Sequence, residues 1–172
     1  PRNRDAIIWL WSIYLGLNLI QILMLWAGGM SLFDSICHAF STIATAGFSP
    51  KNSSIGYYGS AYFDWVTIIF MFLGGMGFML FYHMLKSEWK MIQVNTELRW
   101  YASIVFFLCC ITTLILSING TYENFFDSLR YASFQVTSLL TTTGFTTADY
   151  ELWPQSTKML LYIACFIGAC AG

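Results

Sequence analysis

The sequence predicts an all-α membrane protein in which one arrangement of helices occurs twice. The first indication is composition, since 57% of the 172 residues are hydrophobic, 10% are charged and the mean hydropathy is +0.60. Soluble domains carry about a quarter charged residues. The second indication is a set of apolar segments long enough to cross a bilayer, and the third is a pair of motifs that recur.

Four segments are predicted to span the membrane. A spanning helix needs about 20 mostly apolar residues to cross about 30 Å of hydrocarbon. Three segments meet this length, and a fourth begins and is incomplete; they are residues 6–27, 62–85, 99–118 and 158–172. The chain lacks an initiator Met and stops inside an apolar segment, so we expect an internal fragment of a longer protein.

Two shorter apolar stretches, residues 32–44 and 125–141, lie between these spans. They are too short and too rich in Ser and Thr for spans, and their length suits re-entrant helices. The first five residues and the segment from Lys86 to Arg99 then share a face that holds five of the eight Lys and Arg residues. The positive-inside tendency makes that face cytoplasmic, so the N-terminus and the linker 86–98 are expected there.

The start of each short helix carries the first repeated motif. Ser31-Leu-Phe-Asp34-Ser35 recurs 93 residues later as Asn124-Phe-Phe-Asp127-Ser128. In each copy a potential N-cap residue is followed three positions later by a carboxylate, which resembles a capping box. Asp34 and Asp127 are therefore expected to support the short helices structurally, with cation attraction at a pore mouth as the alternative.

The loop after each short helix carries the second motif. Thr45-Ala46-Gly47-Phe48-Ser49 recurs 97 residues later as Thr142-Thr143-Gly144-Phe145-Thr146. Both copies match, at Thr, Gly and the aromatic, the Thr-Val-Gly-Tyr-Gly loops whose carbonyls replace the hydration shell of potassium. Gly can adopt backbone conformations that point successive carbonyls into one pore. The predicted ion-binding filter residues are Thr45, Ala46, Gly47, Phe48, Thr142, Thr143, Gly144 and Phe145.

Two further polar residues are expected to support the filter loops. His38 lies in the first short helix where the second has Gln135, and both can hydrogen-bond the backbone beneath a filter. His38 and His83 have no second His or Cys at ligand spacing, so neither a metal centre nor a cofactor is expected. A net charge of −1 provides no basic patch for nucleic acid, and no catalytic grouping lies at membrane depth, so the chain is not expected to be an enzyme.

These motifs resemble those of TrkH-type potassium uptake proteins. The resemblance rests on residues 37–49, on residues 141–149 with Trp153-Pro154, and on the glycine-rich stretch 166–172. It implies repeats of transmembrane helix, re-entrant pore helix with filter loop, and transmembrane helix, four of which surround one pore. Residues 1–85 would then form the second repeat and residues 99–172 a truncated third.

The resemblance also implies partners and location. It implies potassium transport across the inner (plasma) membrane by a multi-pass protein surrounded by lipid. It further implies a homodimer, a cytosolic nucleotide-binding regulatory subunit of the TrkA type, no metal beyond the transported ion, and a gating loop after Gly172. The alternative is a secondary transporter with broken helices that binds a small solute, for which Asn18 and Gln21 are the main polar candidates within the spans.

Overall fold

The computed structural model describes residues 2–76 and 95–168, with side chains from Ile7 onward. All regular elements in these ranges are helical, which confirms the predicted fold class. The predicted span 62–85 beyond residue 76, most of the linker 86–98, His83 and the end of span 158–172 lie outside the described residues. The helices are α1 (Arg2–Ala27), α2 (Leu32–Ile43), η1 (Ser54–Tyr58), α3 (Ala61–Gly74), α6 (Thr96–Ile118), α7 (Phe125–Leu140), η2 (Tyr150–Leu152) and α8 (Gln155–Ile167).

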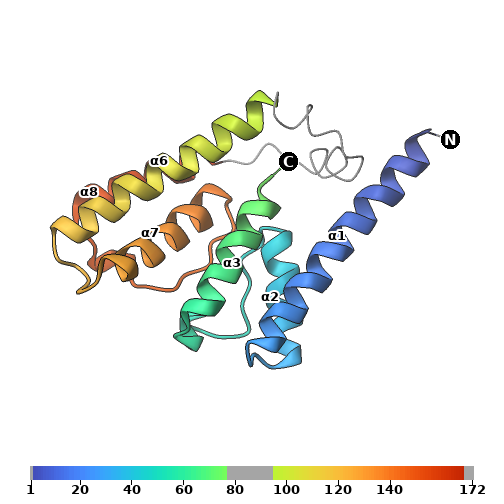
Figure 1. The fold of residues 1–172 in the computed structure, drawn as a ribbon, viewed down its shortest axis with the longest axis horizontal. Helices are drawn as coiled ribbons and strands as arrows, with labels where there is room; N and C mark the ends of the chain where they lie inside the picture. The colour runs from blue at the N-terminus through green and yellow to red at the C-terminus, as the bar shows by residue number, and fades with distance from the viewer. Residues whose placement is uncertain (1, 77–94, 169–172) are drawn as a thin grey trace.

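The helices form two units of the same design (Figure 1). In the first unit α1 leads into the short helix α2, then a loop with the 3₁₀ helix η1, then α3; in the second, α6, α7, η2 and α8 follow in the same order. Each short helix packs against the long helix before it, and α7 also packs against α3 of the first unit. The units therefore share an interface, with a short helix on each side of α3.

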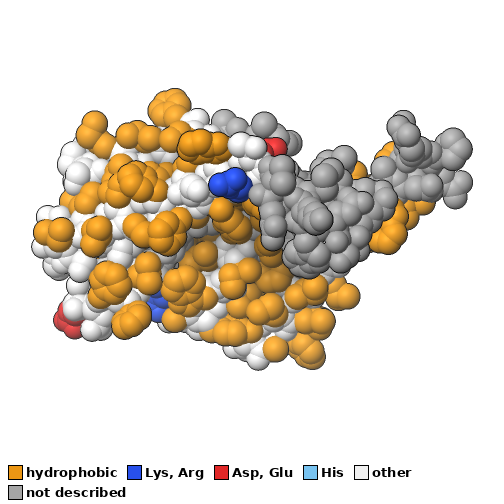
Figure 2. All heavy atoms as spheres, turned by 45° about the horizontal axis from the view of Figure 1, so that its top comes forward, with side chains coloured by type: hydrophobic (Ala, Val, Ile, Leu, Met, Phe, Trp, Pro, Cys, Tyr) orange, Lys and Arg blue, Asp and Glu red, His pale blue; other side chains and the backbone are white. Residues whose placement is uncertain are grey.

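Helices α1 and α6 have the length and composition of membrane spans. Residues Ile7–Ala27 and Thr96–Ile118 are both long and apolar enough to cross a bilayer. Many of their large apolar side chains are exposed, and Figure 2 shows hydrophobic side chains spread widely over one face of the molecule. Such a surface suits contact with hydrocarbon or with other helices better than contact with water.

The core crosses the boundary between the units. One buried cluster combines Leu25, Phe63 and Met71 of the first unit with Phe134 and Phe145 of the second. A separate cluster lies within the second unit, around Leu108, Leu116, Val136, Leu161 and Trp153. The two units are consequently interlocked by aromatic side chains that the second unit inserts into the first.

The expected capping boxes form only in part. The Ser31 hydroxyl accepts a hydrogen bond from Asp34 N at 3.1 Å, as a cap should. Asn124 makes no side-chain cap bond; its amide donates to Asp127 Oδ2 at 3.4 Å. The Asp34 carboxylate binds Tyr58 at 2.8 Å instead of reaching back to the N-cap. The prediction was wrong for Asn124, whose amide binds Asp127 instead of a backbone group. It was also wrong for the carboxylates, because Asp34 binds the distant Tyr58 and Asp127 binds Arg130 one helical turn later.

The third helix of each unit meets the end of the short helix at a glycine. A Cβ added at Gly74 would lie 3.1 Å from the carbonyl oxygen of Ile43, and one added at Gly168 would overlap that of Leu140. Ile43 and Leu140 are the last residues of α2 and α7. Both units therefore use a glycine at the end of their third helix to let it approach the short helix closely.

Candidate ion-filter site

The two Thr-x-Gly loops share an uncommon backbone conformation. Thr45 and Gly47 have φ values of 48° and 69°, and Thr142 and Gly144 have 57° and 85°. The residue between them does not have a positive φ in either loop. A β-branched residue at positive φ is a genuine outlier, and such strain gathers at functional sites. Because the equivalent threonines of both units have this strained conformation, the two loops share one backbone geometry.

The backbone N–H groups of these loops bind the end of the preceding helix. Ala46 N donates to Ser41 O at 2.8 Å, and Gly144 N donates to Ser138 O at 3.2 Å. When φ alternates in sign along a segment, successive N–H groups point to one side of the chain and the carbonyl groups to the other. Within the described ranges, no hydrogen bond ends on the carbonyl oxygens of residues 45–47 or 142–144. These six oxygens therefore have no donor in that part of the chain, although the Thr143 oxygen packs against Gly47. Neutral carbonyl oxygens of this kind can bind a cation.

The two loops touch each other although they lie 97 residues apart in sequence. A Cβ added at Gly47 would overlap the carbonyl oxygen of Thr143, so only glycine fits at this contact. A Cβ added at Gly144 would meet nothing within 4 Å. Gly47 therefore faces the neighbouring loop, whereas Gly144 borders open space.

His38 links the first short helix to the residue that ends the first loop. Its ring is fully buried, with Nδ1 2.8 Å from Asp34 O and Nε2 2.9 Å from Ser49 Oγ. Because a carbonyl only accepts, Nδ1 carries the proton, and in the neutral ring Nε2 accepts from the Ser49 hydroxyl. His38 thus binds a side chain rather than the loop backbone that the sequence suggested.

Gln135, Ser138 and Thr141 of the second unit form hydrogen bonds to the second loop and to the segment after it. Gln135 Nε2 donates to Ala148 O at 3.2 Å, and Ser138 Oγ donates to Phe145 O at 2.7 Å. The hydroxyls of Thr141 and Thr143 lie 2.8 Å apart. Ser138 corresponds to Ser41 of the first unit, and this recurrence is a sequence signal from which a role in the loop could have been predicted.

The two aspartates at the short-helix starts have different partners. Asp34 is buried and accepts from Tyr58 Oη at 2.8 Å, with Lys51 Nζ at 3.3 Å. The Tyr58 hydrogen bond holds the pKa of Asp34 below its usual value, against the opposing effect of burial. Burial, together with the same bond, raises the pKa of Tyr58, so its hydroxyl stays protonated.

Asp127 takes part in an ion-pair group at the interface of the units. Arg130 lies with Nη2 3.2 Å from Asp127 Oδ1 and with Nε 3.4 Å from Asp64 Oδ2. Asp64 belongs to α3 and is buried, so Arg130 joins the first unit to the second. Sequence reasoning did not identify this pair, since 66 residues separate its members.

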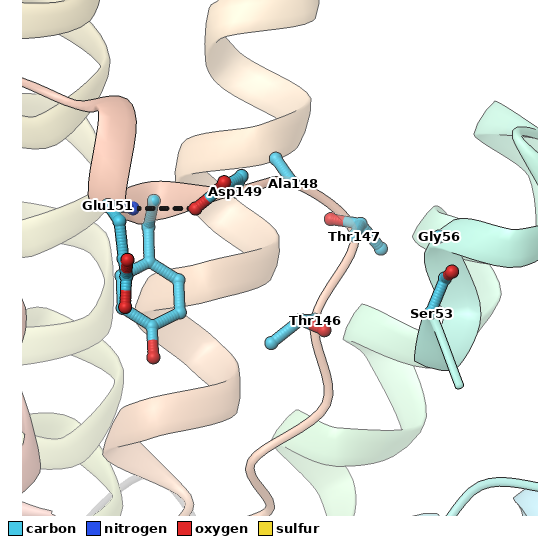
Figure 3. Close-up of a pocket in the computed structure, with 8 residues that line it drawn as sticks. Ser53, Gly56, Thr146, Thr147, Ala148, Asp149 and Glu151 are labelled. Carbon is cyan, nitrogen blue, oxygen red and sulfur yellow. Dashed lines mark hydrogen bonds between the residues drawn. The ribbon is translucent and has the colours of Figure 1, made fainter. Parts of the chain in front are cut away.

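A cavity of about 390 Å³ lies beside the exit of the second loop. It is bounded by Ser53 and Gly56 on one side and by residues 146–151 on the other (Figure 3). Within it the Asp149 carboxylate accepts from Glu151 N at 3.0 Å. The cavity therefore has an acidic wall, formed by Asp149 and Glu151 in the segment that follows the second loop.

Comparison with known proteins matches the entire chain to one family. The sequence model described as "TrkH: Cation transport protein" covers residues 1–172. The Trk system potassium uptake protein TrkH of Escherichia coli K12 is 37% identical over 173 residues, which cover 100% of this chain and 36% of the relative. The protein named TrkG from the same strain is 32% identical, with the same coverage.

A solved structure also matches. The crystal structure of the potassium transporter TrkH from Vibrio parahaemolyticus superposes with a TM-score of 0.88 at 33% identity, over 95% of this chain and 36% of that one. The chain accordingly spans about a third of the length of these relatives.

Proposed function

The chain belongs to the TrkH cation transport family, and we propose that it forms two neighbouring walls of a potassium-conducting pore. The observation that carries the proposal is the shared geometry of the loops at residues 45–47 and 142–144, whose carbonyl oxygens have no donor among the described residues. A potassium ion that leaves water requires such neutral oxygens to replace its hydration shell.

The helices that precede the loops supply a favourable field. The C-terminal end of a helix carries a partial negative charge, and α2 and α7 both end directly before a filter loop. Neither helix has a basic residue in its last turn that would neutralise this charge. A cation at the loops is stabilised by both helix ends.

Exposure of the two filter phenylalanines supports a ring of more than two units. Phe145 is 1% exposed and packs 5.8 Å from the His38 ring of the first unit, whereas Phe48 is 80% exposed. A preceding unit would give Phe48 the socket that Phe145 already has. In this proposal residues 1–85 and 99–172 are two consecutive members of the ring, and the family resemblance implies that they are the second and the third.

The proposed partners and membrane location rest on the family resemblance. The relatives are named as proteins of a Trk system, which supports a multi-component assembly. In this proposal the protein is a homodimer in the plasma membrane with its first residues cytoplasmic, and it works with a cytosolic nucleotide-binding subunit. It requires no resident cofactor, since potassium is the cargo.

A solute transporter with broken helices is the second candidate. It would use Asn18 and Gln21, which are buried in α1. The Asn18 amide donates to Tyr14 O at 2.8 Å and the Gln21 amide to Thr42 Oγ1 at 3.0 Å. The amide nitrogens of both residues are thus bound within the protein, whereas Asn18 Oδ1 and Gln21 Oε1 have no hydrogen-bond partner among the described residues and are the atoms that a solute would bind.

Rubidium uptake tests the proposal. The natural protein that carries this sequence is expressed in cells without potassium uptake systems, together with Gly144→Ser and the control Gly16→Ala, whose Cβ meets nothing within 4 Å. We expect uptake by the wild type and the control, and weaker discrimination against sodium in Gly144→Ser. Uptake indifferent to Gly144→Ser would refute the filter assignment and favour the solute transporter.

A further inference from the structure

The 3₁₀ helix η1 of the first unit reaches the outer end of the second filter loop. Gly56 N donates to Thr146 O at 3.1 Å, and Thr146 N donates to Ser54 Oγ at 3.3 Å. Both backbone polar groups of Thr146 are thus bound by residues about 90 positions earlier in the chain. Thr146 lies two residues after Gly144, so these bonds act directly on the filter.

The contact is tight and places Ser54 in a strained conformation. A Cβ added at Gly56 would lie 3.0 Å from Thr147 O and 3.2 Å from Thr147 Cα. Ser54 has φ 54°, a value that non-glycine residues adopt rarely and keep only where the surroundings enforce it. Backbone therefore packs against backbone here, and neither segment can shift without the other.

The helix η1 is itself fixed firmly in the first unit. Ile55 is fully buried in the core cluster that also contains Phe134 and Phe145. Tyr58 donates to Asp34 at the start of α2 and packs against the His38 ring at 5.9 Å. One end of η1 thus belongs to the support of the first filter, and the other end binds the second.

We propose that η1, through Ser54 and Gly56, is a positioning strap that sets the place of Thr146 and thereby the spacing of the carbonyls at residues 142–144. Gly144 N is already bound to Ser138 O, and Phe145 O and Ala148 O are bound by Ser138 Oγ and Gln135 Nε2. The strap adds a fixed point at Thr146, between the last two of these bonds. Ser54 is a positioning residue, and the inference rests on the filter function proposed above.

The strap makes ion discrimination in one unit depend on the preceding unit. Selectivity in carbonyl filters depends on the number and arrangement of the coordinating oxygens. Without the strap, Thr146 would lose both of its bonds to the first unit, and the nearby carbonyls of residues 142–144 could shift to suit a smaller, more strongly hydrated ion. Removing the strap should therefore change ion selectivity in a protein that still assembles in the membrane.

The test uses the natural protein in cells that lack potassium uptake, with Ser54→Gly and Gly56→Ala. Ser54→Gly removes the acceptor for Thr146 N and relieves the strain, while Gly56→Ala forces the two backbones apart. Ser53→Ala is the matched control, because Ser53 is exposed and makes no side-chain cap bond. The readouts are the sodium concentration that halves rubidium uptake and the maximal uptake per amount of protein in the membrane.

We expect Ser54→Gly to lower the half-inhibiting sodium concentration by about fivefold, the factor that corresponds to one ordinary hydrogen bond. Gly56→Ala should lower it at least as far, and Ser53→Ala should not change it. Ser54→Asn keeps an acceptor and tolerates positive φ, so it should restore part of the loss.

A fall in maximal uptake with an unchanged sodium response in Ser54→Gly would overturn the strap, since it would show a structural role alone. If Gly56→Ala fails to reach the membrane, Ser54→Gly decides by itself. Gly144→Ser is measured in parallel. If Gly144→Ser discriminates less than the wild type while Ser54→Gly does not, the filter stands and the strap fails; if both behave as the wild type, the filter function itself has failed.

Discussion

At the scale of single residues, the filter geometry depends on the backbone conformation of Thr45 and Thr142. Each threonine adopts a positive φ, at an energetic cost of about 1–3 kcal/mol for such a conformation. The neighbouring N–H groups bind the helix end and hold the loop in place. The strain persists because these bonds and the surrounding packing enforce it. In the part of the chain that the structure describes, the carbonyl oxygens of the loops are left without a donor.

The two filter glycines should differ in their tolerance of a side chain. Gly47→Ala and Gly144→Ala both place a Cβ at positive φ, which costs about 1–2 kcal/mol. Only Gly47→Ala also overlaps the Thr143 carbonyl. We therefore expect a lower melting temperature for Gly47→Ala than for Gly144→Ala in the purified protein. Equal melting temperatures, or the reverse order, would contradict the contact between the loops.

Asp34 should stabilise the protein over most of the pH range. Its pKa is lowered from 3.8 in the folded state, so the unfolded state binds more protons at low pH. The stabilisation is complete above about pH 4 and disappears as the pH falls through the folded pKa. The melting temperatures of wild type and Asp34→Asn should differ by a constant amount from about pH 8 to about pH 5. A difference that shrinks within that window would contradict this assignment.

Short helices that end beneath a filter are the main result at the element scale. The sequence predicted both helices at residues 32–44 and 125–141, and they end one residue earlier, at Ile43 and Leu140. The composition of these helices and the Thr-x-Gly loops that follow them made it possible to predict where the helices end. Helix α1 begins at Arg2 rather than residue 6, because polar residues can continue a helix that apolar periodicity does not detect.

The contacts between elements could not be predicted in this way. The bonds of His38 to Ser49, of Tyr58 to Asp34 and of Ser54 to Thr146 join residues that follow no shared spacing rule. Local propensity and periodicity describe one element at a time. The filter residues were therefore predictable as a motif, and most of the groups that hold them were not.

The ion pair of Arg130 and Asp64 should be the strongest polar link between α3 and α7. Removing one partner of a buried pair leaves a charge without compensation and costs about 3–5 kcal/mol. We expect Arg130→Met to lower the melting temperature strongly, and the double variant Arg130→Met with Asp64→Leu to recover most of the loss. Losses that simply add in the double variant would show that the pair does not join the helices energetically.

At the scale of the whole molecule, the second unit depends on contacts that the first unit supplies. The first unit provides the socket for Phe145, the strap for Thr146 and the acidic partner for Arg130. The chain spans about a third of the length of its relatives. In the proposed ring, further units would repeat these contacts.

Phe48 and Phe145 test this repetition. In the 172-residue chain, Phe145→Ala should cost about 3–5 kcal/mol of stability, as for other buried aromatics. Phe48→Ala should change stability by less than about 0.5 kcal/mol, since its side chain is exposed. In the natural protein both substitutions should lower the melting temperature to a similar degree. A harmless Phe48→Ala in the natural protein would contradict a preceding unit that covers this side chain.

The central claim is that the Thr-x-Gly loops of both units coordinate one ion through backbone carbonyls. Anomalous diffraction from crystals of the natural protein soaked in rubidium tests it most directly. The account predicts a rubidium peak in contact with carbonyl oxygens of residues 45–47 and 142–144 together. Rubidium bound only in the acidic cavity near Asp149 and Glu151, with no peak between the loops, would contradict it.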